Sequence, residues 1–151
     1  MSNEIRLTAR LVDSLYVEAM VLADEVRAYF DEHGRVEREA LPPLLRVAFS
    51  CESLKVTTRL MHVIAWLLTQ RAVEHGEISP AQARSSSRRL GVAAESDPEA
   101  LAALPEAART LVDASRDIYA RVERLDLDMD QPTVAVPSPA RGLLSRLERA
   151  F

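Results

Sequence analysis

The sequence predicts an all-α protein, a three-helix bundle built on one long central helix, and three observations support this class. Residues 42–75 open with two prolines, which suit a first turn, and then run without proline or glycine to Gly76, a typical left-handed helix stop. Apolar residues recur at steps of three and four, and no sustained strand-like alternation is present. The 151 residues are 48% hydrophobic and 28% charged, an ordinary composition for one globular domain.

The central segment has two neighbouring apolar seams. The first seam is Leu44, Val47, Cys51, Leu54, Thr58, Met61, Ala65, Leu68 and Ala72, and the second is Phe49, Ser53, Val56, Leu60, Val63 and Leu67. A surface helix needs only one apolar stripe, so this helix should be covered on several sides. We expect it to pack on two neighbours and to leave a self-complementary patch for a second copy. The candidates for that dimer contact are Phe49, Val56, Leu60, Val63, Trp66 and Leu67, with plain core as the alternative for Trp66.

A first helix should precede the central one. It is expected to begin near Thr8 or Asp13, both acceptable N-caps, and to end near Asp31, before Gly34. The charged stretch 33–41 is interpreted as a loop.

After the central helix, a short extra helix and a last long helix are expected. The short helix opens with Ser79 as N-cap and Gln82 completing a capping box, and should run to about Leu90, with Gly91 as its stop. Residues 91–104 form a connector in which Ser96-Asp97-Pro98 can open one helical turn. The last helix is expected over 105–125, because proline at its start cannot lie in a helix interior.

The chain is expected to divide into a bundle domain, 1–125, and a tail, 126–151. The tail begins with a flexible linker rich in aspartate and proline, and ends in an amphipathic segment. We predict that the tail is disordered in isolation. Two interpretations remain open: a frayed terminus, or a tethered peptide that becomes helical in a partner's groove. In the second, the partner-binding side chains are Leu143, Leu144, Leu147 and Phe151.

No catalytic, cofactor or metal constellation is visible in the sequence. His33, His62 and His75 are too scattered for a metal motif, and His62 is interpreted as a structural histidine. Cys51 lies on an apolar seam without a sequence-local histidine or basic neighbour, so a small core residue is favoured over a nucleophile. With four glycines in the chain, there is little material for a phosphate loop.

Charge, cysteine content and hydropathy bear on the kind of partner and the cellular compartment that we expect. The net charge of −4 argues against nucleic-acid binding by bulk charge. The single cysteine excludes an intrachain disulfide and fits a reducing cytoplasm. The most apolar run, 60–68, is too short to span a bilayer, and the N-terminal segment lacks the core of a signal peptide, so no membrane association is expected.

Three arginines, Arg84, Arg88 and Arg89, form a basic patch around three serines. A solvated face is the default interpretation, and contact with an acidic partner surface is the alternative. From the residues alone, the protein is predicted to be an interaction protein.

One stretch resembles a known family. Residues 43–78, with the run RVAFSCES, TTRLM, AWLL and RAV, resemble the core signature of the RcdA family, and residues 16–31 are similar to its first helix. These proteins are alphaproteobacterial regulators of CtrA degradation and act as adaptors for the ClpXP protease. The resemblance implies a three-helix bundle, a homodimer, no enzymatic activity and a disordered C-terminal tail.

The resemblance also implies partners. They are the ClpXP complex, further adaptors and protein cargo, among them cell-cycle regulators, in the cytoplasm with the cell pole as a candidate site of recruitment. The alternative function is a helical DNA-binding transcriptional regulator that uses the region from Arg84 to Arg89. A third hypothesis is an enzyme that uses Cys51 or His62, although neither belongs to a catalytic constellation.

Overall fold

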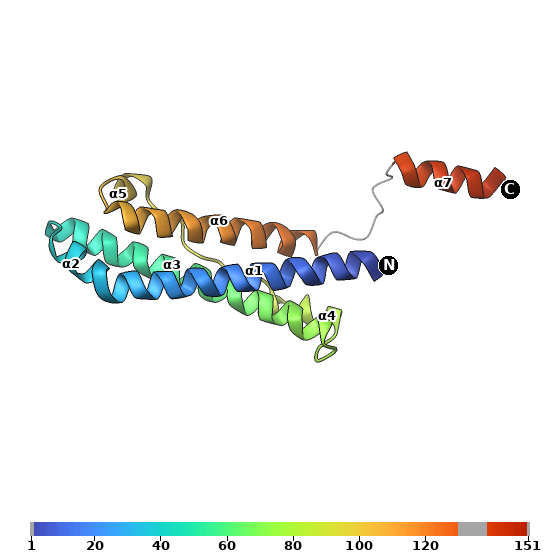
Figure 1. Cartoon of the computed structure of the whole chain (residues 1–151), viewed down its shortest axis with the longest axis horizontal. Coiled ribbons are helices and arrows are strands. Elements are labelled where there is room, and N and C mark those ends of the chain that lie inside the picture. Colours follow the sequence, from blue (N-terminus) through green and yellow to red (C-terminus); the bar gives the residue numbers. More distant parts are fainter. Residues whose placement is uncertain (1, 130–138, 151) are drawn as a thin grey trace.

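Three long helices form the bundle that the sequence predicts. The computed structural model describes residues 2–129 and 139–150, and its long helices are α1 (Ser2–Ala28), α3 (Pro43–Glu74) and α6 (Glu106–Asp128). Figure 1 shows them side by side along the molecule's long axis. No strand occurs in the described part of the chain. The predicted all-α class and the long central helix are therefore confirmed.

The ends of α3 are as predicted. Pro43 occupies the first helical position, where its missing N–H has no intrahelical partner to lose. At the other end, Gly76 has a φ of 72° and donates to the carbonyl of Val73 (3.1 Å), while Glu77 donates to Ala72 (2.9 Å). This pair of bonds satisfies carbonyls that would otherwise be left open at the helix end.

The core lies between the three long helices and is mostly aliphatic. The three long helices contribute the buried apolar side chains Val12, Leu15, Ala19, Leu22 and Val26 from α1, Phe49, Val56, Leu60, Val63, Trp66 and Leu67 from α3, and Ala108, Leu111, Val112, Ile118 and Val122 from α6, and Leu101 and Leu104 complete the core. Each set repeats at steps of three and four, so each helix turns one stripe inward.

The predicted loop at 33–41 is wrong. The chain stays helical through a π-helical turn, η1 (Tyr29–His33), and α2 (Gly34–Glu39), and α1 begins at Ser2, earlier than predicted. Gly34 does not stop the helix, since its φ is −62°. A Cβ at Gly34 would lie 2.8 Å from the Tyr29 carbonyl oxygen and 3.4 Å from the Phe49 ring. Glycine is present here because the backbone packs closely, not because the helix ends.

The predicted short helix is also shorter than expected. Ser79 and Gln82 form the capping box as predicted, but α4 (Pro80–Ala83) makes one turn and is followed by the 3₁₀ turn η2 (Ser86–Arg88). Serines compete for backbone hydrogen bonds and are poor helix interiors, which explains why the helix stops before the run 85–87. The predicted end at Leu90, with Gly91 as stop, is wrong.

Two further elements complete the bundle. The helical turn expected after Ser96 is present as α5 (Pro98–Ala102), and the Asp97 side chain accepts from the N–H of Glu99 (3.0 Å). Helix α6 continues past the predicted end at Leu125 to Asp128. Asp126 is buried in the bundle and so does not begin a linker.

The tail contains one described helix, α7 (Pro139–Ala150). Figure 1 shows it apart from the bundle. The predicted linker falls mainly on residues 130–138, which lie outside the described residues, as does Phe151.

Candidate interaction surfaces

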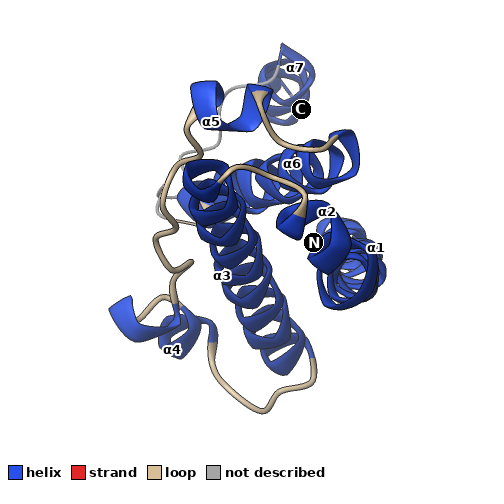
Figure 2. Ribbon diagram, turned by 90° about the vertical axis from the view of Figure 1, so that its left-hand side faces the viewer, coloured by secondary structure: helices blue, strands red, loops and turns tan. Residues whose placement is uncertain are grey.

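An extended segment runs along the bundle and joins α4 to α5. We call residues 89–97 the strap; residues 90–97 contain no helix or strand. Figure 2 shows this segment passing along α3 from the α4 end toward α5. Side chains of α3 and α6 hold the strap at three levels, and together they decide which surfaces the bundle presents.

The first anchor is Asp126, near the end of α6. Arg89 Nε lies 2.8 Å from Asp126 Oδ1 and the Arg89 guanidinium also donates to the Asp126 carbonyl oxygen (2.8 Å). Trp66 Nε1 donates to the same carboxylate (2.8 Å). Because Asp126 is buried, its carboxylate would be costly to the fold without these hydrogen-bond partners. The anchor therefore ties the strap to both α3 and α6.

The second anchor is Gly91. The Tyr119 hydroxyl donates to the Gly91 carbonyl oxygen (2.7 Å). A Cβ on Gly91 would lie 2.6 Å from Nδ1 of His62, so the strap backbone rests directly on that ring. Burial, together with nearby Glu123, raises the pKa of Tyr119, which stays a neutral donor. The predicted structural role of His62 matches this position.

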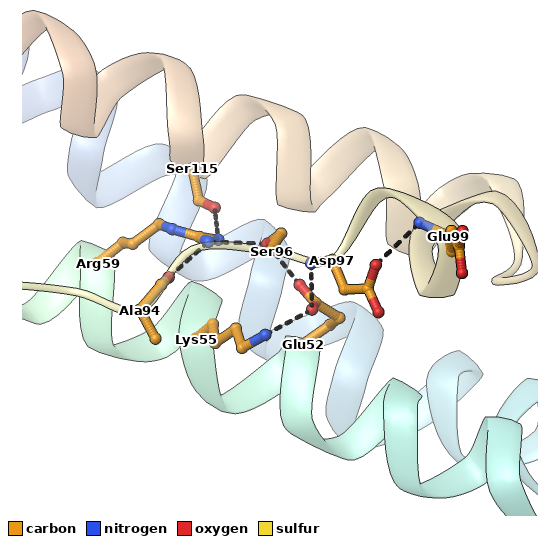
Figure 3. Close-up of polar contacts among 8 residues, drawn as sticks. All are labelled: Glu52, Lys55, Arg59, Ala94, Ser96, Asp97, Glu99 and Ser115. Atoms are coloured by element: carbon orange, nitrogen blue, oxygen red, sulfur yellow. Dashed lines mark hydrogen bonds and ion pairs between the residues drawn. The ribbon is translucent and has the colours of Figure 1, made fainter.

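The third anchor is a buried polar network around Ser96 (Figure 3). Arg59 donates to the Ala94 carbonyl oxygen (3.0 Å) and to the hydroxyls of Ser96 (2.8 Å) and Ser115 (3.3 Å). The Ser96 hydroxyl in turn donates to Glu52 (2.5 Å). Lys55 Nζ lies 2.9 Å from the same carboxylate. The network joins α3, α6 and the strap.

Opposite charges compensate each other within this network. Glu52 is 2% exposed and Arg59 is 3% exposed. Burial by itself raises the pKa of Glu52, but the hydrogen bonds from Ser96 and Lys55 outweigh it and hold that pKa below its usual value. Burial lowers the pKa of Arg59, and the Glu52 carboxylate opposes that change. The structure keeps both groups charged in a low-dielectric setting, which requires that neither loses its partners.

Sequence reasoning missed these anchors. A pair such as Glu52 and Lys55, three positions apart, is ordinary on the surface of a helix, and the predicted linker included Asp126. A usable signal was present: Glu52 and Arg59 are seven positions apart, so they lie on one face of the helix, and that face is otherwise apolar. The partner Ser96 is distant in sequence, and no local pattern points to it.

The two apolar seams of α3 differ in burial. Phe49, Val56, Leu60, Val63, Trp66 and Leu67, the predicted dimer contact, all lie in the core of a single chain. The first seam instead faces outward, with Leu44, Leu54 and Met61 each more than half exposed. We call Leu44, Val47, Cys51, Leu54, Thr58, Met61, Ala65 and Leu68 the outer stripe. A dimer contact on α3 remains a prediction, and the outer stripe is the apolar face available for it.

The predicted basic patch is divided. Arg84 and Arg88 are exposed, whereas Arg89 binds Asp126 inside the strap anchor. In the tail, Leu143 and Leu147 are exposed on α7, and the side chain of Leu144 lies outside the described set.

Other site classes find little support in the described residues. No group of three His, Cys, Asp or Glu side chains there is placed to hold a metal ion. None of the helices in the described ranges is long and apolar enough to cross a membrane. Cys51 is exposed on the outer stripe rather than buried in the core.

Fold and surface together define a class: a three-helix bundle with a strapped connector and an apolar helix face open to a partner. The chain matches, over residues 3–151, the family described as Protein of unknown function (DUF1465). It is also similar to the crystal structure of RcdA from Caulobacter crescentus CB15, with 35% identity and a TM-score of 0.65, over 79% of this chain and 90% of that one. The chain belongs to the RcdA family. No curated protein matches it.

Proposed function

We propose that this protein is a non-enzymatic adaptor in regulated proteolysis, which binds cell-cycle regulatory proteins or further adaptors and helps deliver them to ClpXP. The observation that carries this proposal is the 35% identity to RcdA over 90% of that chain. The outer stripe and the amphipathic α7 support it, because each has exposed apolar side chains among the described residues, as at Leu54 and Leu143. The protein would act in the cytoplasm, with recruitment to the cell pole.

Tethering is the proposed mechanism. A partner bound to α7 stays close to the bundle because residues 130–138 join the two covalently, and short linkers can supply effective concentrations on the order of millimolar. Leu143 and Leu147 are one turn apart, so they lie on the same face of α7 and are exposed. That face could pack into an apolar groove on the partner. The bundle and the tail then have separate tasks, and damage to one should spare the other.

The bundle is proposed to dimerise through the outer stripe. Its positions follow a heptad repeat in which Leu54, Met61 and Leu68 alternate with the smaller Cys51, Thr58 and Ala65. If two copies of α3 pack antiparallel about a two-fold axis, large residues meet small ones. Leu54 then packs against Thr58 of the partner subunit, and Met61 against the partner's Cys51. A two-fold contact requires such self-complementarity.

The test is degradation of a candidate cargo by purified ClpXP with and without this protein. We expect the full chain to accelerate degradation, and the variant Leu143→Glu/Leu147→Glu to fold and dimerise normally but deliver less. The double variant Arg84→Glu/Arg88→Glu tests in the same assay whether the exposed arginines contribute to cargo delivery. No acceleration with any cargo, with all other adaptors present, would reject the adaptor function.

A further inference from the structure

A groove lies between the strap and α6. Its volume is about 610 Å³, within the range of about 300–1,000 Å³ that is typical of ligand sites. One wall is formed by Val92, Ala93 and Glu95 of the strap, and the other by Arg116, Ala120 and Glu123 of α6. The small alanines leave room, and the three anchors hold the strap wall in place. Such a preformed wall lowers the entropic cost of binding.

The strap wall offers unpaired main-chain groups. Across the strap, Gly91 and Ala94 carbonyl oxygens accept from Tyr119 and Arg59, and the Asp97 N–H lies 3.5 Å from Glu52. Val92 and Glu95 make no backbone hydrogen bond within the described residues. Val92 is 89% exposed. Extended peptides are recognised through main-chain groups of this kind together with alternate side chains.

The groove is lined by three carboxylates, Glu95, Asp117 and Glu123, and by two cations, Arg59 and Arg116. Among the described residues, Arg116 pairs with Asp113 (3.8 Å), and Asp117 pairs with Arg121 (3.1 Å). Glu95 and Glu123 are exposed on opposite walls; Glu95 lies within electrostatic range of the buried Arg59, and neither carboxylate forms a salt bridge within the described part of the chain. A ligand that placed positive charges between them would be complementary to both walls.

We propose that this groove binds an extended, basic segment of a protein partner. A lysine or arginine of that segment pairs with Glu95 and Glu123, and an alternate apolar side chain packs on Val92 and Ala120. If the bound segment belongs to the cargo, that assignment rests on the proposed adaptor function. The binding itself does not require a protease.

Fluorescence anisotropy with a labelled decapeptide of alternating valine and lysine tests the proposal, and the matching valine–glutamate peptide tests the charge requirement. We expect the full-length protein to bind the basic peptide and not the acidic one. The variant Glu95→Lys/Glu123→Lys should bind about tenfold more weakly or worse. Ala120→Trp, which fills the groove but keeps both carboxylates, should weaken binding similarly.

The matched control is Glu39→Lys/Glu77→Lys, which changes the net charge equally on exposed residues outside the groove. Equal weakening by both charge reversals would show that bulk charge attracts the peptide, and would overturn the proposal. Absence of binding at about 1 mM peptide would also overturn it. If Glu95→Lys/Glu123→Lys binds no peptide yet delivers cargo normally, the groove is not the cargo site although the adaptor function stands. If the peptide binds but no cargo is delivered, the groove stands and the adaptor function fails.

Discussion

Arg59, in the middle of α3, donates a hydrogen bond to Ser96, which lies 37 positions further along the chain (2.8 Å). The same Ser96 hydroxyl donates a hydrogen bond to Glu52, so it bridges two buried, oppositely charged groups. The end of the strap is thereby fixed to the central helix. Because buried charges are costly when unpaired, this link should be the most sensitive polar feature of the fold.

The first prediction concerns Glu52→Gln. The amide is nearly isosteric but cannot neutralise Arg59, so the free energy of unfolding should fall by about 3 kcal/mol. Urea denaturation followed by circular dichroism measures this loss. Glu99→Gln, an exposed carboxylate near the same strap end, is the control and should change stability by less than about 0.5 kcal/mol. Equal effects of the two substitutions would contradict the role given to the network.

The second prediction is a pH dependence of that loss. The folded-state pKa of Glu52 lies below its ordinary value of 4.5, so its contribution to stability is complete above that value and is lost as the pH falls through the folded pKa. The difference in unfolding free energy between the natural protein and Glu52→Gln should be constant from pH 7 to about 5.5 and should shrink below about pH 4.5. A difference that grew on acidification would refute this sign.

The third prediction concerns Gly91 and His62. A Cβ at Gly91 would lie 2.6 Å from Nδ1 and 2.7 Å from Cγ of the ring, and Cγ cannot swing away freely. Gly91→Ala should therefore destabilise the protein by about 1–3 kcal/mol. The double variant Gly91→Ala/His62→Ala should be less destabilised than the sum of the two single variants, since the clash is gone. A strictly additive double-mutant cycle would show that the two residues are not coupled.

The fourth prediction separates Arg89 from its exposed neighbours. Arg89→Ala removes the guanidinium from the Asp126 carboxylate but leaves the hydrogen bond from Trp66, and should lower the free energy of unfolding by about 2–3 kcal/mol. The fluorescence of Trp66, the single tryptophan, should shift at the same time. Arg84→Ala/Arg88→Ala should leave both stability and fluorescence unchanged. If Arg89→Ala behaved like that pair, the ion pair with Asp126 would not anchor the strap.

The fifth prediction tests the outer stripe as a dimer contact. Leu54→Glu/Met61→Glu places charges on two exposed positions of α3, so it should give monomers in light-scattering measurements while the helix content is unchanged. Thr110→Glu, on the exposed side of α6, is the control. Antiparallel packing further predicts that Leu54→Cys/Thr58→Cys, in a Cys51→Ser background, forms disulfide-linked dimers under oxidising conditions. A monomeric natural protein would reject the contact altogether.

Part of the fold was predictable because its signals are local. Pro43 and Gly76 bound α3 through their own backbone preferences, and Ser79 with Gln82 caps α4. The predicted helix end before Gly34 was wrong for a physical reason. A glycine can end a helix or permit close packing, and the close approach of the Tyr29 carbonyl and the Phe49 ring decides for packing.

The sequence by itself determined the class of fold, the long central helix and the presence of two apolar seams on it. Only the tertiary structure decided which seam is core, because both are apolar at the same spacing and the choice depends on where α1 and α6 pack. The same holds for Glu52, Arg59 and Asp126, whose charges are tolerated inside the protein only because distant residues meet them there. Periodicity reports which faces of a helix are apolar, whereas burial and charge pairing are settled by neighbours that are remote in sequence.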